Sequence, residues 1–288
     1  MKPARWMAAL LLLLLCCGAS ALGEESGQPG TAVDWVMDRL YALRRPDPIF
    51  WKYQDHSVAT EQDVDDIAGT LRALGITGVT DEDVWDAKAV ISGEAAEEAI
   101  KSLEATLDAP LSQEDREALE AYYETMTSEY SRSRVTLDLL REAGWGTYDG
   151  DGRWQPTSDT VYSFDIELYG DTLYGDFFAG LNAICGGEWV FSELEEDYAD
   201  VNLEEGTGVL HLRFLLNGQP QQIDAQMACD WFDTGVLNRI MAMTADSSGG
   251  RRLYALYDGH QAFILLYNTP QWAKRFTSET GCPLFKAL

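Results

Sequence analysis

The spacing of apolar residues changes near residue 145, and this change limits the folds that the chain can adopt. Before it, apolar residues recur every three or four positions, which is typical of helices with one buried face. After it, in residues 161–169, apolar and polar side chains alternate, which is typical of a strand with one buried face. We therefore predict an α+β chain, in which an N-terminal helical bundle is followed by an antiparallel sheet with helices packed on one face.

Capping residues divide the first half into helices. Thr60 and Thr80 each stand three positions before an aspartate, and Gly75 ends the first of these two segments. Pro46 and Pro110 end two other apolar patterns, because proline breaks a helix interior. The predicted helices are about 31–45, 60–75, 80–93, 94–107 and 112–140.

The last of these segments is the longest helical pattern of the chain. Its apolar positions follow steps of four and three from Leu119 to Leu140, the spacing of a seam that faces another helix. The partner is either the upstream helices or a second copy of the chain. We favour the upstream helices, because the run lacks sustained charged flanks and Ser133 interrupts it.

The second half carries strand and hairpin signals. Asn217–Gly218 and Asp258–Gly259 are dipeptides of the kind that tight hairpin turns require. The first strand is expected to bury one face and to leave the other in water. Its predicted inner residues are Tyr162, Phe164, Ile166 and Leu168, and its predicted outer residues are Ser163, Asp165 and Glu167. With three intervening helical patterns, the predicted order is β-α-β-β-β-α-β-β-α.

These patterns suggest a division of the chain into five parts. They are a signal peptide (1–21), a flexible linker (22–30), a helical domain (31–143), a junction (144–159) and an α+β domain (160–288). A mature chain of about 265 residues is long enough for two modest domains.

The N-terminal leader predicts export. Lys2 and Arg5 precede an apolar core from Met7 to Cys17, and Ala19 and Ala21 provide a small-residue cleavage site. The leader resembles those of bacterial exported proteins. We favour cleavage after Ala21 and secretion; the alternatives are a lipid on Cys17, which would hold the protein at the outer face of the cytoplasmic membrane, and an uncut anchor.

The net charge restricts the partners. Without Lys2 and Arg5 the chain keeps 19 basic residues against 48 acidic ones. Such a surface repels phosphate groups and anionic lipids. We expect no nucleic acid partner, and membrane contact only through the leader or a lipid on Cys17.

The cysteines and histidines raise one catalytic alternative. Cys185, Cys229 and Cys282 show no metal-ligand spacing and are expected to be buried, inert thiols. Cys229 precedes a predicted helix, so a cysteine hydrolase with a histidine base stays open. The candidate bases are His56, His211 and His260; His211 is expected to point away from the core beside Arg213. No other catalytic motif is present, and we expect no metal or cofactor.

An aromatic segment gives the remaining hint of function. Trp145, Tyr148 and Trp154 lie in a Gly/Asp-rich stretch without a periodic buried face, and such rings can hold sugars or peptides by stacking. The alternative is that they fill the seam between two domains. The sequence thus predicts an exported, acidic, non-catalytic binding module whose ligand is a protein, a peptide or a glycan.

Overall fold

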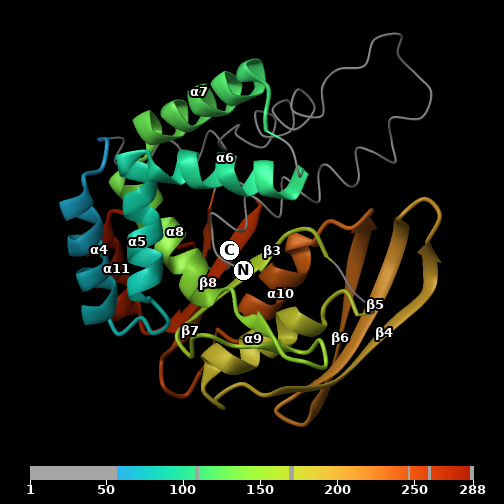
Figure 1. Cartoon of the computed structure of the whole chain (residues 1–288). Helices are drawn as coiled ribbons and strands as arrows, with labels where there is room; N and C mark the ends of the chain where they lie inside the picture. The colour runs from blue at the N-terminus through green and yellow to red at the C-terminus, as the bar shows by residue number, and fades with distance from the viewer. Residues whose placement is uncertain (1–56, 108–109, 169–171, 246, 259–260, 286–288) are drawn as a thin grey trace. The chain divides into compact units, whose positions relative to one another are not determined.

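The computed structural model describes residues 57–107, 110–168, 172–245, 247–258 and 261–285 (Figure 1). The leader, the linker, the predicted helix at 31–45, His56, Gly259 and His260 lie outside these residues. The chain divides into two compact units and passes between them three times: within α4 (Glu61–Ala73), between Val79 and Thr80, and within α8 (Arg132–Gly144). Unit 1 comprises residues up to Ala68 with Thr80–Leu139, and unit 2 comprises Gly69–Val79 with Leu140–Leu288.

Unit 1 is helical, and its predicted caps are confirmed. The Thr80 hydroxyl accepts from the Asp83 N–H at 3.1 Å, and the Asp83 carboxylate accepts from the Thr80 N–H at 2.7 Å. Thr60 and Asp63 make the same reciprocal pair. These contacts satisfy N–H groups that have no partner inside the helix, so they explain where α4 and α5 (Asp81–Ser92) begin.

The prediction of one continuous helix over residues 112–140 is wrong. The chain forms α7 (Gln113–Glu129) and then α8, because Tyr130 leaves the helical conformation. The Tyr130 carbonyl accepts from the Ala59 N–H at 2.8 Å, and its side chain is buried. Buried residues of α7 pack with those of α5 and α6 (Glu94–Leu107), so the upstream helices are confirmed as its partners.

Unit 2 has the predicted α+β class and order of elements, but its strands form separate sheets. The buried sheet consists of β3 (Val161–Asp165), β8 (Ala262–Asn268) and β7 (Arg252–Tyr257), in that spatial order. The open sheet consists of β4 (Phe191–Asn202), β5 (Thr207–Leu216) and β6 (Gln219–Ala228). All pairs are antiparallel, and β1 (Thr147–Tyr148) with β2 (Trp154–Gln155) forms a further short ladder.

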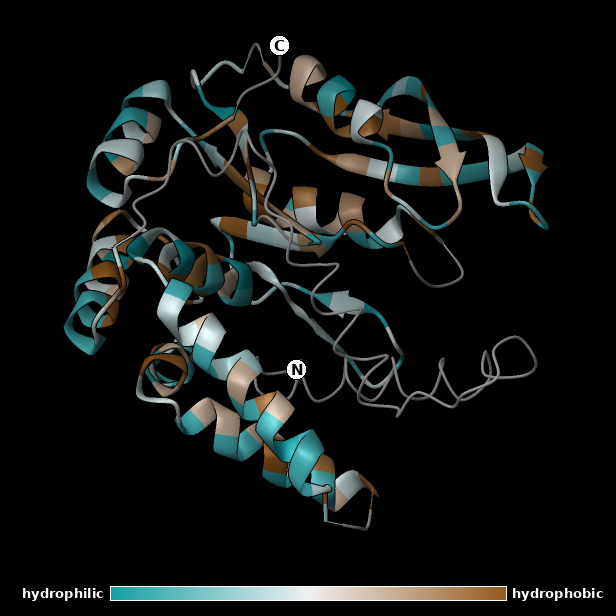
Figure 2. Ribbon diagram, turned by 90° about the horizontal axis from the view of Figure 1, so that it is seen from above, coloured by the Kyte–Doolittle hydropathy of each residue, from teal (hydrophilic) through white to brown (hydrophobic). Residues whose placement is uncertain are grey.

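Two helices explain why the strands form two sheets and not the single sheet that was predicted. α9 (Gly175–Cys185) contacts β3 and β8 of the buried sheet and β4 of the open sheet, and α10 (Thr234–Met243) contacts β7 and β6. Both helices therefore lie between the sheets (Figure 1), and residues of all these elements form one hydrophobic core. Figure 2 shows hydrophobic and hydrophilic residues interspersed along the helices and strands. In the open sheet they alternate, so one face of that sheet is apolar and packs on this core.

The buried sheet is covered on both faces, contrary to the prediction. Tyr162 and Phe164 of β3 face the core as predicted, but Ser163, predicted to face water, is only 2% exposed. Its hydroxyl donates to the Leu140 carbonyl at 3.3 Å, which satisfies it without water. The C-terminal turn of α8 lies against this second face, where a Cβ on Gly144 would come within 2.7 Å of the Ser163 hydroxyl.

One close contact fixes α9 on β3. The Tyr162 hydroxyl donates to the Asp176 carbonyl at 3.0 Å, and a Cβ on Gly180 would come within 2.3 Å of the Tyr162 ring. Glycine at this position thus lets the buried ring lie directly on the helix backbone. α9 ends as predicted at Gly186, which has a left-handed φ of 57°.

The open sheet follows the prediction closely. Asn217 and Gly218 have φ values of 50° and 76°, as a two-residue hairpin turn requires. The apolar residues of β5 and β6 that face the core are Leu210, Leu212, Phe214, Leu216, Ile223 and Ala225. The unit ends with α11 (Pro270–Thr280), capped by the Thr269 hydroxyl and ended by Gly281.

Candidate functional site

The aromatic segment is largely engaged in contacts within unit 2. The Trp154 indole N–H donates to the Trp145 carbonyl at 2.9 Å, and its ring meets Tyr162 edge to face at 5.2 Å. Trp154 also covers Gly146, where a Cβ would come within 2.3 Å of the indole. Trp154 therefore packs against the core, and Trp145 is half-buried.

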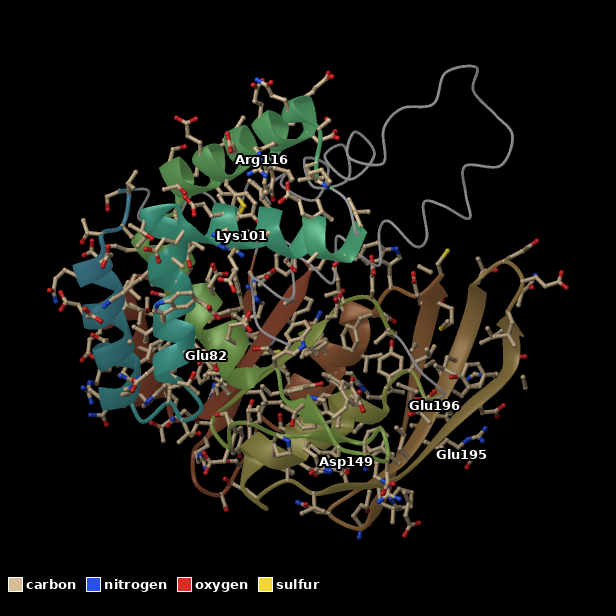
Figure 3. All side chains as sticks on the ribbon, in the orientation of Figure 1. Glu82, Lys101, Arg116, Asp149, Glu195 and Glu196 are labelled. Atoms are coloured by element: carbon tan, nitrogen blue, oxygen red, sulfur yellow. The ribbon has the colours of Figure 1, made fainter. Side chains whose placement is uncertain are left out.

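Tyr148 is the exposed member of this segment. Its side chain is 63% exposed, and its hydroxyl donates to the Asp176 carboxylate at 2.5 Å. Burial of the hydroxyl and this hydrogen bond raise the pKa of Tyr148. The nearby Asp149 carboxylate (labelled in Figure 3) accepts from three groups of its own turn. Trp145, Tyr148 and Trp154 thus do not present a common exposed aromatic surface.

The polar face of the open sheet offers a larger exposed surface. We define the open face as the outward side chains of six residues at the middle of the sheet: Glu195, Asp197, Asp200, His211, Arg213 and Asp224. Side chains alternate between the faces of a strand, so the neighbours of these residues on β5 and β6 face the core. Figure 3 labels Glu195 beside Glu196, and the two have different roles. The Glu196 carboxylate holds the N–H groups of Leu173 and Tyr174 just before α9.

His211 lies at the centre of the open face, between two carboxylates. Its Nδ1 is 2.8 Å from Asp224 and its Nε2 is 2.9 Å from Asp200. A carboxylate only accepts hydrogen bonds, so both ring nitrogens must donate, and His211 is an imidazolium in this arrangement. The hydrogen bonds to Asp200 and then Asp224 raise the pKa of His211 above its usual value. The prediction that His211 points away from the core is confirmed.

Arg213 makes the second charge network of the open face. It donates to Asp197 at 2.8 Å and to Glu195 at 3.3 Å. The N–H of Ala199 and the Arg213 guanidinium lower the pKa of Asp197. The open face therefore has four carboxylates around two cations. Among the described residues, no group of three or more histidine, cysteine and acidic side chains is placed to hold a metal ion.

A second group of carboxyls lies at the end of β3. Burial raises the pKa of Asp165 to about 7, against the opposing effect of the hydrogen bond from the Glu167 N–H. The charges of Glu167, Asp258 and Asp230 act in the same direction as burial. Asp258 is itself buried and pairs with Arg141 at 3.3 Å. Titration near neutral pH is common in catalytic carboxyls, but buried structural networks also cause it.

The three cysteines of the described residues lie in two different environments. Cys185 and Cys282 are buried as predicted, and burial raises the pKa of Cys185 to about 12. The prediction of a buried thiol is wrong for Cys229, which is exposed and has a φ of 58°. Its N–H donates to the Gly206 carbonyl at 2.6 Å, so the turn at the end of β6 holds it outside the core.

The geometry gives little support to the cysteine hydrolase alternative. His211 cannot act as a base here, because both of its nitrogens already donate to aspartates. His56 and His260 lie outside the described residues. The hydrolase therefore stays an untested alternative without a described histidine partner for Cys229.

Comparison with known proteins identifies no matching protein family, no similar curated protein and no similar solved structure. Among the described residues, none of the helices combines the length and apolar character needed to cross a membrane.

The central pair of the open face, His211 with Asp224, was not predicted, although the sequence contains a signal for it. Counting outward from the Asn217–Gly218 turn places Asp224 directly opposite His211, as the structure confirms. Asp200 could not be found in this way. The pairing of β4 with β5 contains a register irregularity between Asp197 and Asp200, which the sequence does not reveal.

Proposed function

We propose that the chain is an exported acidic bacterial protein that acts as a non-catalytic binding module, and that it binds a protein or peptide through the open face. Export rests on the leader, with cleavage after Ala21 favoured over a lipid on Cys17. The observation that supports binding is the open face itself, where six charged or ionisable side chains are arrayed on a sheet whose other face is part of the core.

The chemistry of the open face favours a polypeptide over a glycan. Sugars are commonly held on exposed aromatic rings, and the six open-face residues include none. Tyr148 is the exposed ring of the segment first considered for this role, and its hydroxyl is already bonded to Asp176. Charged side chains at fixed spacing instead suit the charged and polar groups of another polypeptide.

The test is selection of ligands from a random peptide library displayed on phage, using the mature chain as bait. Selected peptides should lose at least about tenfold in affinity for the double variant Glu195→Gln with Asp197→Asn, since exposed charge contacts define the surface. The matched control, Asp151→Asn with Glu279→Gln, removes equal charge from a turn and from α11 and should bind normally. Loss of binding in Tyr148→Ala, with the double variant unaffected, would place the site at the aromatic segment instead.

Export has its own measurement. The intact mass of the protein from native medium and membrane fractions should correspond to a chain that begins at Leu22. A diacylglyceryl-sized increment on a chain that begins at Cys17 would show a lipid anchor, and an intact leader in a cytoplasmic fraction would contradict export.

A further inference from the structure

We infer that the open face binds a cationic segment of a partner polypeptide, and that loss of the His211 proton strengthens this binding by releasing Asp200. This inference rests on the proposed function. The inference depends on the hydrogen bonds of one imidazole and on the charges around it.

The edge strands of the open sheet are poorly suited to pairing with a strand of a partner. β4 is one edge, and two register irregularities interrupt its pairing pattern, which hinders the addition of another strand. β6 is the other edge; it contains Pro220, and the Gln226 N–H already donates to Asp233 at 2.8 Å. Contacts through the side chains of the open face therefore suit a partner better than strand pairing does.

The charges of the open face select the kind of partner. Glu195, Asp197, Asp200 and Asp224 outnumber Arg213 and the protonated His211 by two. The chain as a whole is also strongly acidic, so it attracts cations from a distance. A second copy of the chain would bring together two like-charged faces, and an anionic lipid surface would be repelled. A segment rich in lysine or arginine is complementary.

Deprotonation of His211 changes the hydrogen bonds as well as the charge. A neutral imidazole donates through one nitrogen only, so it can keep one of its two aspartates. Asp224 has a second donor, the Gln222 amide at 2.9 Å. For the Asp200 carboxylate, 71% exposed, His211 is the hydrogen-bond partner that the described residues provide. Asp200 is more exposed than Asp224 (71% against 54%), so water replaces the imidazole more readily at Asp200, and the neutral ring is expected to keep its proton on Nδ1 toward Asp224 and to release Asp200.

The groups around His211 come from all three strands of the sheet. Asp197 and Asp200 face it from β4 and Asp224 from β6, and Arg213 is the next outward residue on β5. The three carboxylates favour the imidazolium, and Arg213 opposes it. Histidine is the side chain whose ordinary pKa lies nearest neutral pH, so His211 is the member of the open face that a change of pH near neutrality is expected to address.

The experiment measures fluorescence anisotropy with a labelled peptide of five Lys-Thr repeats and the full mature chain. At constant ionic strength, binding should be about fivefold tighter at pH 8.5 than at pH 5.5, the effect of one unit charge at about 4 Å in water. His211→Gln should bind equally at both pH values. His56→Gln and His260→Gln remove the other two histidines, Asp165→Asn removes the carboxyl whose pKa burial raises, and all three variants should retain the response. Asp200→Asn should weaken binding at pH 8.5.

Other outcomes separate the inference from the proposed function. If peptides of Glu-Thr or Gln-Thr repeats bind instead and the Glu195→Gln, Asp197→Asn variant loses them, the open face binds polypeptides but the cationic partner is wrong. Self-association that this variant abolishes, measured by sedimentation, would identify a second copy as the occupant and overturn the inference. A pH response that survives in His211→Gln also overturns it. If no peptide distinguishes the variant from the wild type, the proposed function fails as well.

Discussion

The buried sheet and the open sheet share antiparallel pairing and two helices, but they differ in what covers their second face. In β8 the successive residues Leu265 and Leu266 are both fully buried, whereas in β5 the core residue Leu212 is followed by the exposed Arg213. The buried sheet thus contributes mainly to stability. The open sheet contributes to the same core and still presents a row of ionisable side chains that a partner can reach. The difference shows how one unit combines a stable core with an exposed, charged surface.

The largest expected effect tests this difference directly. Leu265→Ala and Leu266→Ala should each lower the free energy of unfolding by about 2–5 kcal/mol, because each leaves a cavity in a packed layer. Leu212→Ala should cost a similar amount, and its neighbour Arg213→Ala about 1 kcal/mol or less, as is usual for exposed ion pairs. Urea denaturation measures all four. A small effect for Leu266→Ala would mean that the second face of the buried sheet is not packed.

A second prediction concerns the contact of α9 with the buried sheet. Gly180→Ala should destabilise unit 2 by about 1–3 kcal/mol, because the new methyl group collides with the enclosed Tyr162 ring. The control is Gly69→Ala in α4, where no atom lies within 4 Å of the added Cβ, and it should be neutral or stabilising by up to about 1 kcal/mol. Thermal unfolding followed by circular dichroism compares the two; equal values would argue against the close helix–sheet contact.

The third prediction concerns Asp165, the carboxyl at the end of β3 in the buried sheet whose pKa is raised. The folded-state pKa of Asp165, about 7, exceeds its ordinary value of 3.8, so folding favours the protonated carboxyl. Its contribution to stability is complete below about pH 4 and is lost as the pH rises to about 7. Asp165→Asn should therefore gain stability relative to the wild type over this interval, on the order of 2 kcal/mol. Urea denaturation at pH 4, 5.5 and 7.5 measures the difference, and a constant offset would contradict the raised pKa.

The smallest expected effect on stability lies at His211 in the exposed network of the open sheet, where the useful measurement is a pKa. Nuclear magnetic resonance should show a His211 pKa above the ordinary histidine value, with both ring nitrogens protonated at pH values below that pKa. Asp200→Asn should lower this pKa, since it removes the first of the two hydrogen-bonded carboxylates. Glu205→Gln, in the turn after β4, is the control for general charge. An unchanged pKa in Asp200→Asn would show that the imidazole does not bridge the two aspartates.

Local chemistry explains what could be predicted from the sequence by itself. The Thr80–Asp83 cap, the Asn217–Gly218 turn and the alternation of β5 each depend on residues close together in the chain. The order of strands and helices in unit 2 and the outward direction of His211 follow from them. The pairing of His211 with Asp224 could also be predicted once the turn was located, because a two-residue turn sets the register of both strands.

Only the tertiary structure decided the features that depend on distant segments. Ser163 is buried because Leu140 and Gly144 lie against it, and Tyr130 ends α7 where it bonds to Ala59. The division into two sheets arises because α9 and α10 pack between them. The alternation of residues within a strand does not indicate which strands share a sheet. Asp200 reaches His211 through an irregular pairing of β4. Burial and the distances between charges depend on which segments pack together in space. The pattern along the chain shows which face of each element is apolar, but not which other segment covers it.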